Sequence, residues 1–288
     1  MLLIGSAKSG TTSLHHYLGA HPEVTMATRR GRAGCEDNDA AGKEMSFFWR
    51  DDWRERMSWY QSHFANMSTA VRGEATPSYS AHPFHRGVAQ RIYSVAPNAR
   101  LLYIVRDPIE RIVSHYIQQR ADGDRRSFAE RMRDYDKPDN SIVCPSRYAW
   151  QLDQYLTFFA ASQLLVVDQH KLRHERRATL RRIFAFLGVA PDFWDPVFER
   201  ESNTRADKYA LTRGGERLFE GCIDPIGRRV AGARWPRLSS PIRRRLSQRV
   251  SERPVIERQL REKLVRMLRP EVERLRELTG EQFESWSL

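Results

Sequence analysis

A lysine lies between two glycines close to the beginning of the chain. The segment Leu2–Leu14 reads LLIGSAKSGTTSL, a short apolar run followed by a loop and by residues that can start a helix. This order of strand, loop and helix is typical of phosphate-binding loops. Gly5 and Gly10 allow the backbone to approach a ligand, helix N–H groups point at it, and Lys8 adds a positive charge. The segment predicts an anion site, although the glycines alone also suit an ordinary turn.

The position of the lysine distinguishes this loop from the ATP-binding P-loop. In that loop, G-x-x-x-x-G-K-[ST], the lysine follows the second glycine. Here Thr11 follows Gly10, and Lys8 precedes Gly10 by two residues. Thr11, Thr12 and Ser13 add hydroxyl donors. The loop therefore indicates phosphate binding without the ATPase pattern.

A second candidate for anion binding is Arg106, which directly follows the apolar stretch 100–105 (RLLYIV). Asp107 and Pro108 then predict the start of a helix, because they are favoured at its N-cap and first position, and Ser114 lies two turns further on. Open α/β sheets bind ligands at the carboxyl ends of their strands, where an arginine can hold a phosphate. Pairing of Arg106 with Asp107 or another nearby carboxylate is the alternative.

The elements that must position these residues alternate between strand and helix. Short apolar runs bounded by turn signals predict strands, and apolar spacing of three to four residues predicts helices. Such alternation favours an α/β fold in which helices cover both faces of a central parallel sheet. The expected strands are 2–4, 70–74, 100–105 and 163–167. The expected helices are 11–20, 53–64, 84–95, one that begins at 107, 146–159, 176–187, 241–250 and 255–278. Residues 28–43 are expected to form a loop, and 201–238 an irregular basic region.

Length and composition suit a soluble globular protein with a substantial core. The 288 residues are 40% hydrophobic and 29% charged, and no linker rich in Pro, Gly or Ser divides them, so we expect one domain over 1–288 with a helical C-terminal portion, 239–288. No apolar run approaches the length of a membrane span. The chain begins within the first expected strand, which leaves no room for a signal peptide here.

The cysteine and charge patterns restrict the partners. Three widely spaced cysteines suggest neither a disulfide framework nor a metal site, and they favour a cytoplasmic location. The net charge of +12 is compatible with a nucleic acid, a membrane surface or an anionic ligand. A solvated basic surface explains most of this charge equally well.

Two segments resemble the donor-binding motifs of sulfotransferases that use 3′-phosphoadenosine 5′-phosphosulfate, PAPS. The segment Gly5–Leu14 resembles their 5′-phosphosulfate loop, and 103–116 (YIVRDPIERIVSHY) is similar to their 3′-phosphate segment, R-[DN]-P-x-x-R-x-x-S-x-Y. The resemblance implies PAPS as sulfuryl donor, 3′-phosphoadenosine 5′-phosphate (PAP) as product, and no metal. It implies that these residues bind the nucleotide: Lys8, Ser9, Gly10, Thr11, Thr12, Ser13, Arg106 and Ser114.

A third segment resembles the branch of the family that acts on heparan sulfate. Residues 43–48 (KEMSFF) resemble its K-E-x-x-F-F segment, in which the glutamate is the general base, so Glu44 is implied to deprotonate the acceptor. Apart from this resemblance, Glu44 reads as a surface carboxylate paired with Lys43. The segment 74–79 (EATPSY) resembles the family's E-K-[ST]-P-x-Y, but Ala75 stands where a lysine is common. Arg72, Arg86 and Lys43 are candidates for replacing that cation.

The resemblance covers residues 2–190 through separated motifs, and it implies a P-loop-like three-layer fold. The arginine-rich composition favours a bacterial member of the family as a hypothesis. In relatives a basic loop near the C-terminus closes over the nucleotide. Here 203–215 is best placed for that role, with Lys208 and Arg213 as candidates. The acceptor would be a small molecule or a glycan, sulfated on a hydroxyl or an amine. The sequence indicates no oligomeric state.

Two other functions compete with this interpretation. A P-loop kinase or NTPase would use 164–168 (LLVVD) as the strand whose aspartate, Asp168, holds magnesium, but the G-K-[ST] pattern is missing. A non-catalytic nucleic-acid-binding protein would explain the charge, but the chain has no recognised binding signature and the paired anion motifs would have no role.

Overall fold

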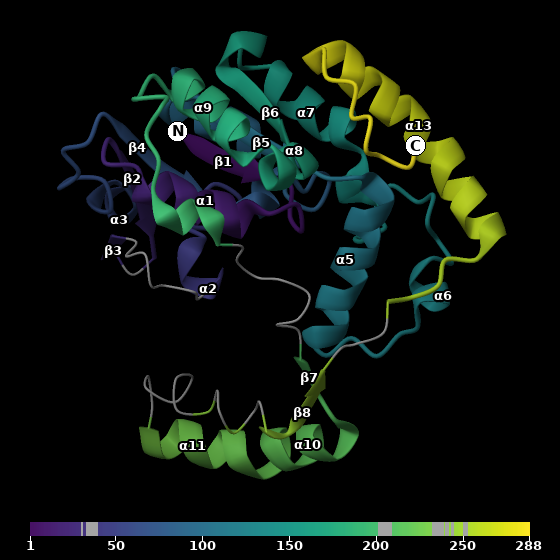
Figure 1. Ribbon diagram of the computed structural model, residues 1–288. Coiled ribbons are helices and arrows are strands. Elements are labelled where there is room, and N and C mark those ends of the chain that lie inside the picture. The colour runs from purple at the N-terminus through teal and green to yellow at the C-terminus, as the bar shows by residue number, and fades with distance from the viewer. Residues whose placement is uncertain are drawn as a thin grey trace. The chain divides into compact units, whose positions relative to one another are not determined.

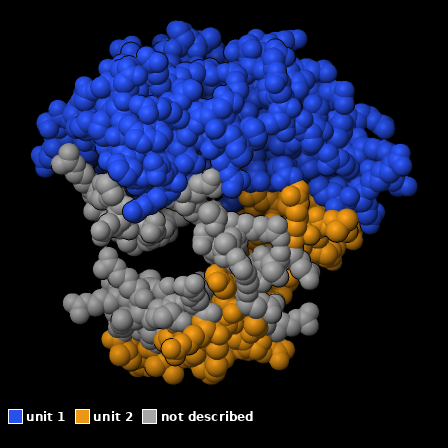
Figure 2. Space-filling view, viewed as in Figure 1, with its two compact units in different colours: residues 1–112, 134–203, 256–288 blue, residues 113–133, 204–255 orange. Residues whose placement is uncertain are grey.

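The computed structural model describes residues 1–29, 31–32, 40–200, 209–231, 239, 242, 245–249 and 253–288. Within them the chain forms two compact units, coloured separately in Figure 2. The first comprises residues 1–112, 134–203 and 256–288, and the second comprises 113–133 and 204–255. The single domain expected from the sequence stays a prediction.

The first unit is built around a six-stranded sheet with the order β3-β2-β4-β1-β5-β6 (Figure 1). Five strands run parallel: β1 (Leu2–Gly5), β2 (Val24–Thr28), β4 (Val71–Ala75), β5 (Leu101–Val105) and β6 (Leu164–Asp168). The short β3 (Gly31–Arg32) pairs antiparallel with β2 at the edge. The predicted parallel sheet is confirmed. The sequence reading missed β2 and β3, because it assigned no element to 24–28 and expected a loop from residue 28 onward.

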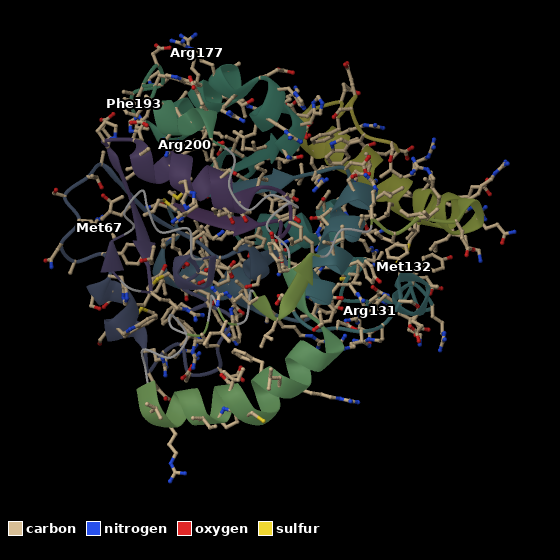
Figure 3. The ribbon with its side chains drawn as sticks, turned by 60° about the horizontal axis from the view of Figure 1, so that its bottom comes forward. Met67, Arg131, Met132, Arg177, Phe193 and Arg200 are labelled. Carbon is tan, nitrogen blue, oxygen red and sulfur yellow. The ribbon has the colours of Figure 1, made fainter. Side chains whose placement is uncertain are left out.

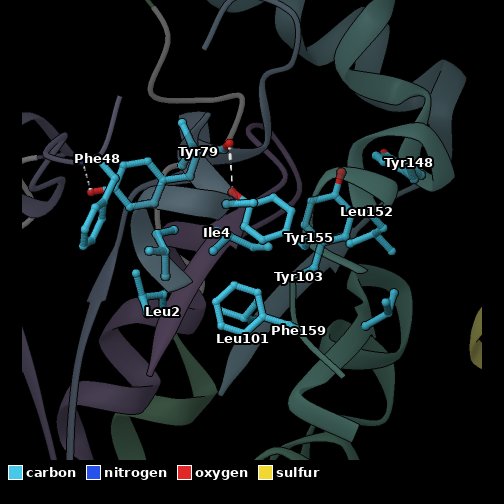
Figure 4. Close-up of a cluster of buried hydrophobic side chains, with 14 of the residues drawn as sticks. Leu2, Ile4, Phe48, Tyr79, Leu101, Tyr103, Tyr148, Leu152, Tyr155 and Phe159 are labelled. Carbon is cyan, nitrogen blue, oxygen red and sulfur yellow. Dashed lines mark hydrogen bonds between the residues drawn. The ribbon is translucent and has the colours of Figure 1, made fainter. Parts of the chain in front are cut away.

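Alternate residues of the strands face two separate cores. Leu2, Ile4, Leu101 and Tyr103 belong to one buried cluster, part of which Figure 4 shows, whereas Leu3 belongs to the other. Since successive side chains of a strand point to opposite faces, both faces of the sheet must be covered. The first cluster includes residues of α3 (Met57–Ser62), α4 (Val88–Val95), α7 (Tyr148–Leu156) and α13 (Arg258–Thr279), and the second includes residues of α1 (Thr11–Ala20), α8 (Gln169–His174) and α9 (Arg176–Leu187). The result is the predicted three-layer α/β arrangement.

Shorter elements connect these layers. The first unit also contains the short helix α2 (Ala40–Lys43) and four 3₁₀ turns: η1 (Pro77–Ser80), η2 (Cys144–Ser146), η3 (Ala161–Gln163) and η4 (Pro196–Glu199). Helix α5 (Pro108–Ala121), which has 14 residues, begins in the same unit. Helix α3 is shorter than the helix expected over 53–64. No described helix is both long enough and apolar enough to cross a membrane.

The second unit contains a small antiparallel pair of strands and several helices. Tyr209–Leu211 (β7) pairs with Ser247–Arg249 (β8), so the helix expected over 241–250 is interrupted by a strand. The region expected to be irregular contains α10 (Arg213–Leu218), the π-helix η6 (Phe219–Ile223) and α11 (Asp224–Ala231). The unit also contains the short helix α6 (Phe128–Arg131), whose last residue, Arg131, is labelled in Figure 3. Arg131 forms an ion pair with Asp124.

Candidate functional site

The loop between β1 and α1 presents the start of a helix that no side chain caps. Gly10 occupies the N-cap position with φ 97°, a left-handed conformation that favours glycine, and no side chain forms a capping hydrogen bond. The first turn of α1 contains no acidic residue. The first N–H groups of a helix need acceptors from outside the helix, and its dipole favours negative charge there. This helix end therefore suits an anion, as the sequence predicted.

The loop is packed tightly between its neighbours. The backbone N–H of Ser6 donates to the carbonyl of Ile104 on β5 at 2.7 Å. A Cβ atom at Gly5 would lie 1.9 Å from Oγ of Ser80, which ends η1. Only glycine allows this approach, so the first glycine of the loop is required by packing against η1. Lys8 itself adopts φ 73°, which places its backbone in the left-handed region.

Arg111 supports the loop from the first turn of α5. Its side chain is fully buried, and its Nε donates to the carbonyl of Ala7, next to Lys8, at 3.1 Å. Its Nη1 donates to the carbonyl of Ile142 at 2.7 Å and to Oγ of Ser146 at 2.9 Å. Burial lowers the pKa of the guanidinium. Sequence reasoning gave Arg111 no role, because its partners lie more than thirty residues away along the chain.

Lys43 brings a second lysine to the first turn of α1. Its side chain is 5% exposed, and Nζ donates to Oγ1 of Thr12 at 3.4 Å. Burial lowers the pKa of Lys43 to about 8, while the neighbouring charge of Glu44 acts in the opposite direction. Burial and the charge of Lys43 together lower the pKa of His15 to about 3, so His15 is neutral at physiological pH.

Glu44 lies within electrostatic reach of the anion loop. It directly follows α2 and is half-buried, and this burial raises the pKa of its carboxyl. The positive charges of Lys43, Arg29 and Lys8 act against that shift. The fold therefore brings together Lys8 and Glu44, which are 36 positions apart in the sequence. A partly desolvated carboxylate beside cations is suited to accept a proton.

The structure distinguishes among the candidates for the cation missing at position 75. Ala75 is fully buried in the core that contains Leu3 and α1 residues. Arg72 and Arg86 are exposed, and Nε of Arg86 donates to the carbonyl of Pro83. Of the three candidates, Lys43 is the one placed against α1.

Arg106 occupies the carboxyl end of β5, as predicted. Its Nη2 lies 3.3 Å from Oε2 of Glu110, and both side chains are about one third exposed. The alternative of a nearby carboxylate partner is thus observed, with Glu110 rather than Asp107. The hydroxyl of Tyr148 donates to the Arg106 carbonyl at 2.7 Å and fixes the backbone there. Since exposed ion pairs contribute little free energy, a phosphate can replace Glu110 as partner.

Asp107 has the capping role expected from its position. Its Oδ1 accepts from the backbone N–H groups of Ile109 and Glu110 at 2.8 and 3.1 Å, and its Oδ2 accepts from the N–H of Ser287 at 2.6 Å. These bonds fix the start of α5 directly after Arg106.

The remaining predicted residues belong to the second unit. Ser114 is half-buried on α5, two turns after Pro108. Arg213 is the first residue of α10. Lys208 lies outside the described residues. Among the described residues, the site can be built from the first unit alone: the anion loop, Lys43, Glu44, Arg106 and Arg111.

These features define an α/β protein with an anion site that combines lysines and a candidate general base. Residues 1–196 match the profile described as Sulfotransferase family, which is more than half of the chain. The chain belongs to the sulfotransferase family, and the membership expected from the motifs is confirmed.

Similar proteins support the same assignment. The bifunctional heparan sulfate N-deacetylase/N-sulfotransferase 2 of Bos taurus is 28% identical over 204 residues, which cover 66% of this chain and 22% of the relative. The human N-deacetylase/N-sulfotransferase 3 is 28% identical over 207 residues, with 67% and 22% covered. The chain thus matches about one fifth of the length of these relatives. A crystal structure of a sulfotransferase from Alicyclobacillus acidocaldarius covers 100% of this chain and 98% of its own, with a TM-score of 0.65 and 23% identity, and shows the same fold.

Proposed function

We propose that this protein transfers the sulfuryl group of PAPS to a hydroxyl or amine of an acceptor. The convergence of Lys8, Lys43 and Glu44 on the uncapped start of α1 is the observation that supports this proposal most. A site with only an anion to hold needs no carboxylate beside it, whereas group transfer needs a proton acceptor as well. The motif resemblance supplies the identity of the donor.

The donor is assigned to two groups of residues. The 5′-phosphosulfate would bind the loop through Lys8, Ser9, Gly10, Thr11, Thr12 and Ser13. Arg106 would hold the 3′-phosphate, exchanging Glu110 for it, and Ser114 would assist. Lys208 and Arg213 stay candidates for the segment that closes over the nucleotide.

The reaction follows from these assignments. The acceptor oxygen or nitrogen forms a bond to sulfur, while the bond between sulfur and the 5′-phosphate oxygen breaks and PAP leaves. The acceptor's proton passes to Glu44. Lys8, Lys43 and the helix dipole stabilise the charge that develops on the transferring group and the leaving phosphate. Lys43 would supply the cation that Ala75 does not.

The acceptor would bind in a cavity lined by η1, α4 and α7. The cavity has a volume of about 160 Å³, and the side chains that line it carry no formal charge at neutral pH. Burial lowers the pKa of both His82 and His85, so both lining imidazoles are neutral. Gln154 offers an amide group, and Phe158 offers an aromatic surface, whereas the buried amide of Gln151 is bonded to the backbone of His82 and Cys144. Such a lining suits a neutral polar part of a glycan or a small molecule.

Calorimetry of the full chain with three ligands tests the proposed function. A sulfotransferase should bind PAP more tightly than ATP with magnesium, and more tightly than double-stranded DNA. Preference for ATP with magnesium would favour a kinase or NTPase. The position of Asp168 does not favour that reading, because its Oδ1 accepts from the N–H of His170 at 3.0 Å and caps α8. Preference for DNA would favour the nucleic-acid-binding alternative.

A further inference from the structure

The segment that follows Glu44 is held by side chains of another element. Residues 44–47 have no regular secondary structure. The backbone N–H of Ser46 donates to Oγ1 of Thr76 at 3.1 Å. The N–H groups of Phe47 and Phe48 both donate to the hydroxyl of Tyr79, at 3.0 and 3.3 Å, and Figure 4 shows the second of these bonds. The hydroxyls of Thr76 and Tyr79 thus accept hydrogen bonds from the N–H groups of three consecutive residues.

Both hydroxyls are oriented by one buried carboxylate, Glu74. Thr76 donates to its Oε2 at 2.8 Å, and Tyr79 donates to its Oε1 at 3.0 Å. A hydroxyl has a single proton, so a hydroxyl that donates to the carboxylate must present its lone pairs to other donors. Glu74 therefore makes Thr76 and Tyr79 acceptors for the segment after Glu44.

The network is enclosed and fully connected. Glu74 is 1% exposed, Thr76 0% and Tyr79 2%. A third hydroxyl, that of Tyr60, also donates to Oε1 of Glu74, at 2.9 Å. Tyr60 contacts the segment through its ring, which packs against Phe47 and Phe48. The Tyr155 hydroxyl fixes the Tyr79 carbonyl at 2.9 Å. In a desolvated site such bonds strengthen one another and tolerate little displacement.

We propose that Glu74 is a positioning residue that sets the place of the general base. Through Thr76 and Tyr79 it fixes the backbone two to four residues after Glu44, and so holds the Glu44 carboxylate at the anion loop. This inference rests on the proposed function, because it assumes that Glu44 is the base. Small displacements of a reacting group cost large factors in rate, whereas the donor, held by other elements, should bind as before.

A matched pair of tyrosine variants tests the inference. Tyr79→Phe and Tyr60→Phe each remove one buried hydroxyl from the same carboxylate oxygen, but only the first releases the segment. The rate of each variant is measured as transfer of the labelled sulfuryl group from ³⁵S-labelled PAPS to N-desulfated heparan sulfate and to water. Tyr79→Phe should lower kcat about tenfold or more with PAP affinity within about twofold, while Tyr60→Phe stays within about twofold of the parent in both. Equal effects of the two variants on kcat would overturn the inference.

Threonine variants and hydrogen exchange make the test independent of the assay. Thr76→Ser keeps the hydroxyl and should retain turnover, whereas Thr76→Val should lose it by about the same factor as Tyr79→Phe. Amide exchange of the peptide containing Phe47 and Phe48 should accelerate in Tyr79→Phe and not in Tyr60→Phe, with or without turnover. Unchanged exchange would refute the positioning role. Failure of the parent protein to bind PAP would instead refute the proposed function.

Discussion

Lys43 and Glu44 are adjacent in the sequence, and burial shifts their pKa values in opposite directions, because it disfavours the charged form of each group. The ammonium of Lys43 loses stability in its buried place, so its pKa falls to about 8, while the pKa of the Glu44 carboxyl rises. The two groups are therefore brought closer to neutrality than either would be in water. This is the arrangement expected of a base and a cation that work at physiological pH.

The pH dependence of turnover should report both groups. The rate should rise with pH as Glu44 loses its proton and becomes a base, and it should fall as pH passes about 8, because Lys43 then loses its charge. Initial rates at saturating PAPS between pH 5 and 10 measure both limbs. Lys43→Met should be slow at every pH.

The control for this assignment is Lys43→Arg. A guanidinium stays protonated far above pH 8, so the fall in rate on the alkaline side should move to higher pH in this variant. If the alkaline limb stays in place in Lys43→Arg, Lys43 is not the group that titrates.

Glu74 should make stability depend on pH. Burial raises its pKa from 4.5 to about 7, although hydrogen bonds from Thr76, Tyr60 and Tyr79 oppose the shift. Between pH 4.5 and 7 the native carboxyl holds a proton that the unfolded chain has released, so stability must fall as pH rises through this window. The free energy of unfolding of the parent relative to Glu74→Gln should fall by roughly 3 kcal/mol. Urea unfolding of both proteins at pH 4.5 and 8 measures this, and a constant difference would contradict it.

Among the elements, the site depends on the close packing of η1 against the end of β1. A Cβ atom at Gly5 would lie 1.9 Å from Oγ of Ser80 and 2.7 Å from Cε2 of Tyr103. Gly5→Ala should therefore destabilise the protein by about 1–3 kcal/mol and weaken PAP binding, because the loop must shift. Thermal unfolding and calorimetry with PAP check both effects.

Gly221→Ala provides the matched control for this substitution. A Cβ atom at Gly221 meets no other atom within 4 Å, and the residue lies in the helix η6, outside the segment 203–215. Alanine should stabilise that helix by about 0.5–1 kcal/mol and leave PAP binding unchanged. Equal responses of the two variants would mean that the contact with η1 has no consequence.

Elements with strong local signals were predictable from the sequence. Asp107 and Pro108 marked the start of α5, and Gly188 and Gly280 end α9 and α13 with positive φ values, as helix C-caps commonly do. Strand β2 was missed although Pro22 and Gly31 flank it, because its short segment, VTMAT, is interrupted by threonines and contains no continuous apolar run. Strand β8 was mistaken for helix, because its pairing with β7 depends on residues 36 or more positions away. Local patterns do not contain such pairings.

In the candidate site, too, the contiguous motifs were predictable and the long-range contacts were not. The anion loop and Arg106 were found because each motif is contiguous. The support of the loop by Arg111 and the place of Lys43 against Thr12 come from contacts across 31 to 104 residues. Spacing along the chain predicts neither, because both depend on how α2 and α5 pack against α1 and the loop before it.

For the whole molecule, the expected single domain predicts that the chain unfolds cooperatively, in one transition. Helix α5 continues from the first compact unit into the second without a break, since residues 108–112 belong to one and 113–121 to the other. A continuous helix couples the stability of the segments it joins. We therefore expect one heat-absorption peak in scanning calorimetry, shifted upward by PAP. Two separate transitions, of which only one responds to PAP, would contradict the single-domain prediction.

The central claim is that this fold assembles Glu44 as the base for sulfuryl transfer from PAPS. Extracts of the producing cell, incubated with ³⁵S-labelled PAPS and the parent protein or Glu44→Gln, test it most directly. A labelled product should form with the parent, and its formation should be at least about a hundredfold slower with the variant, although both bind PAP equally. Undiminished transfer by Glu44→Gln would show that Glu44 is not the base.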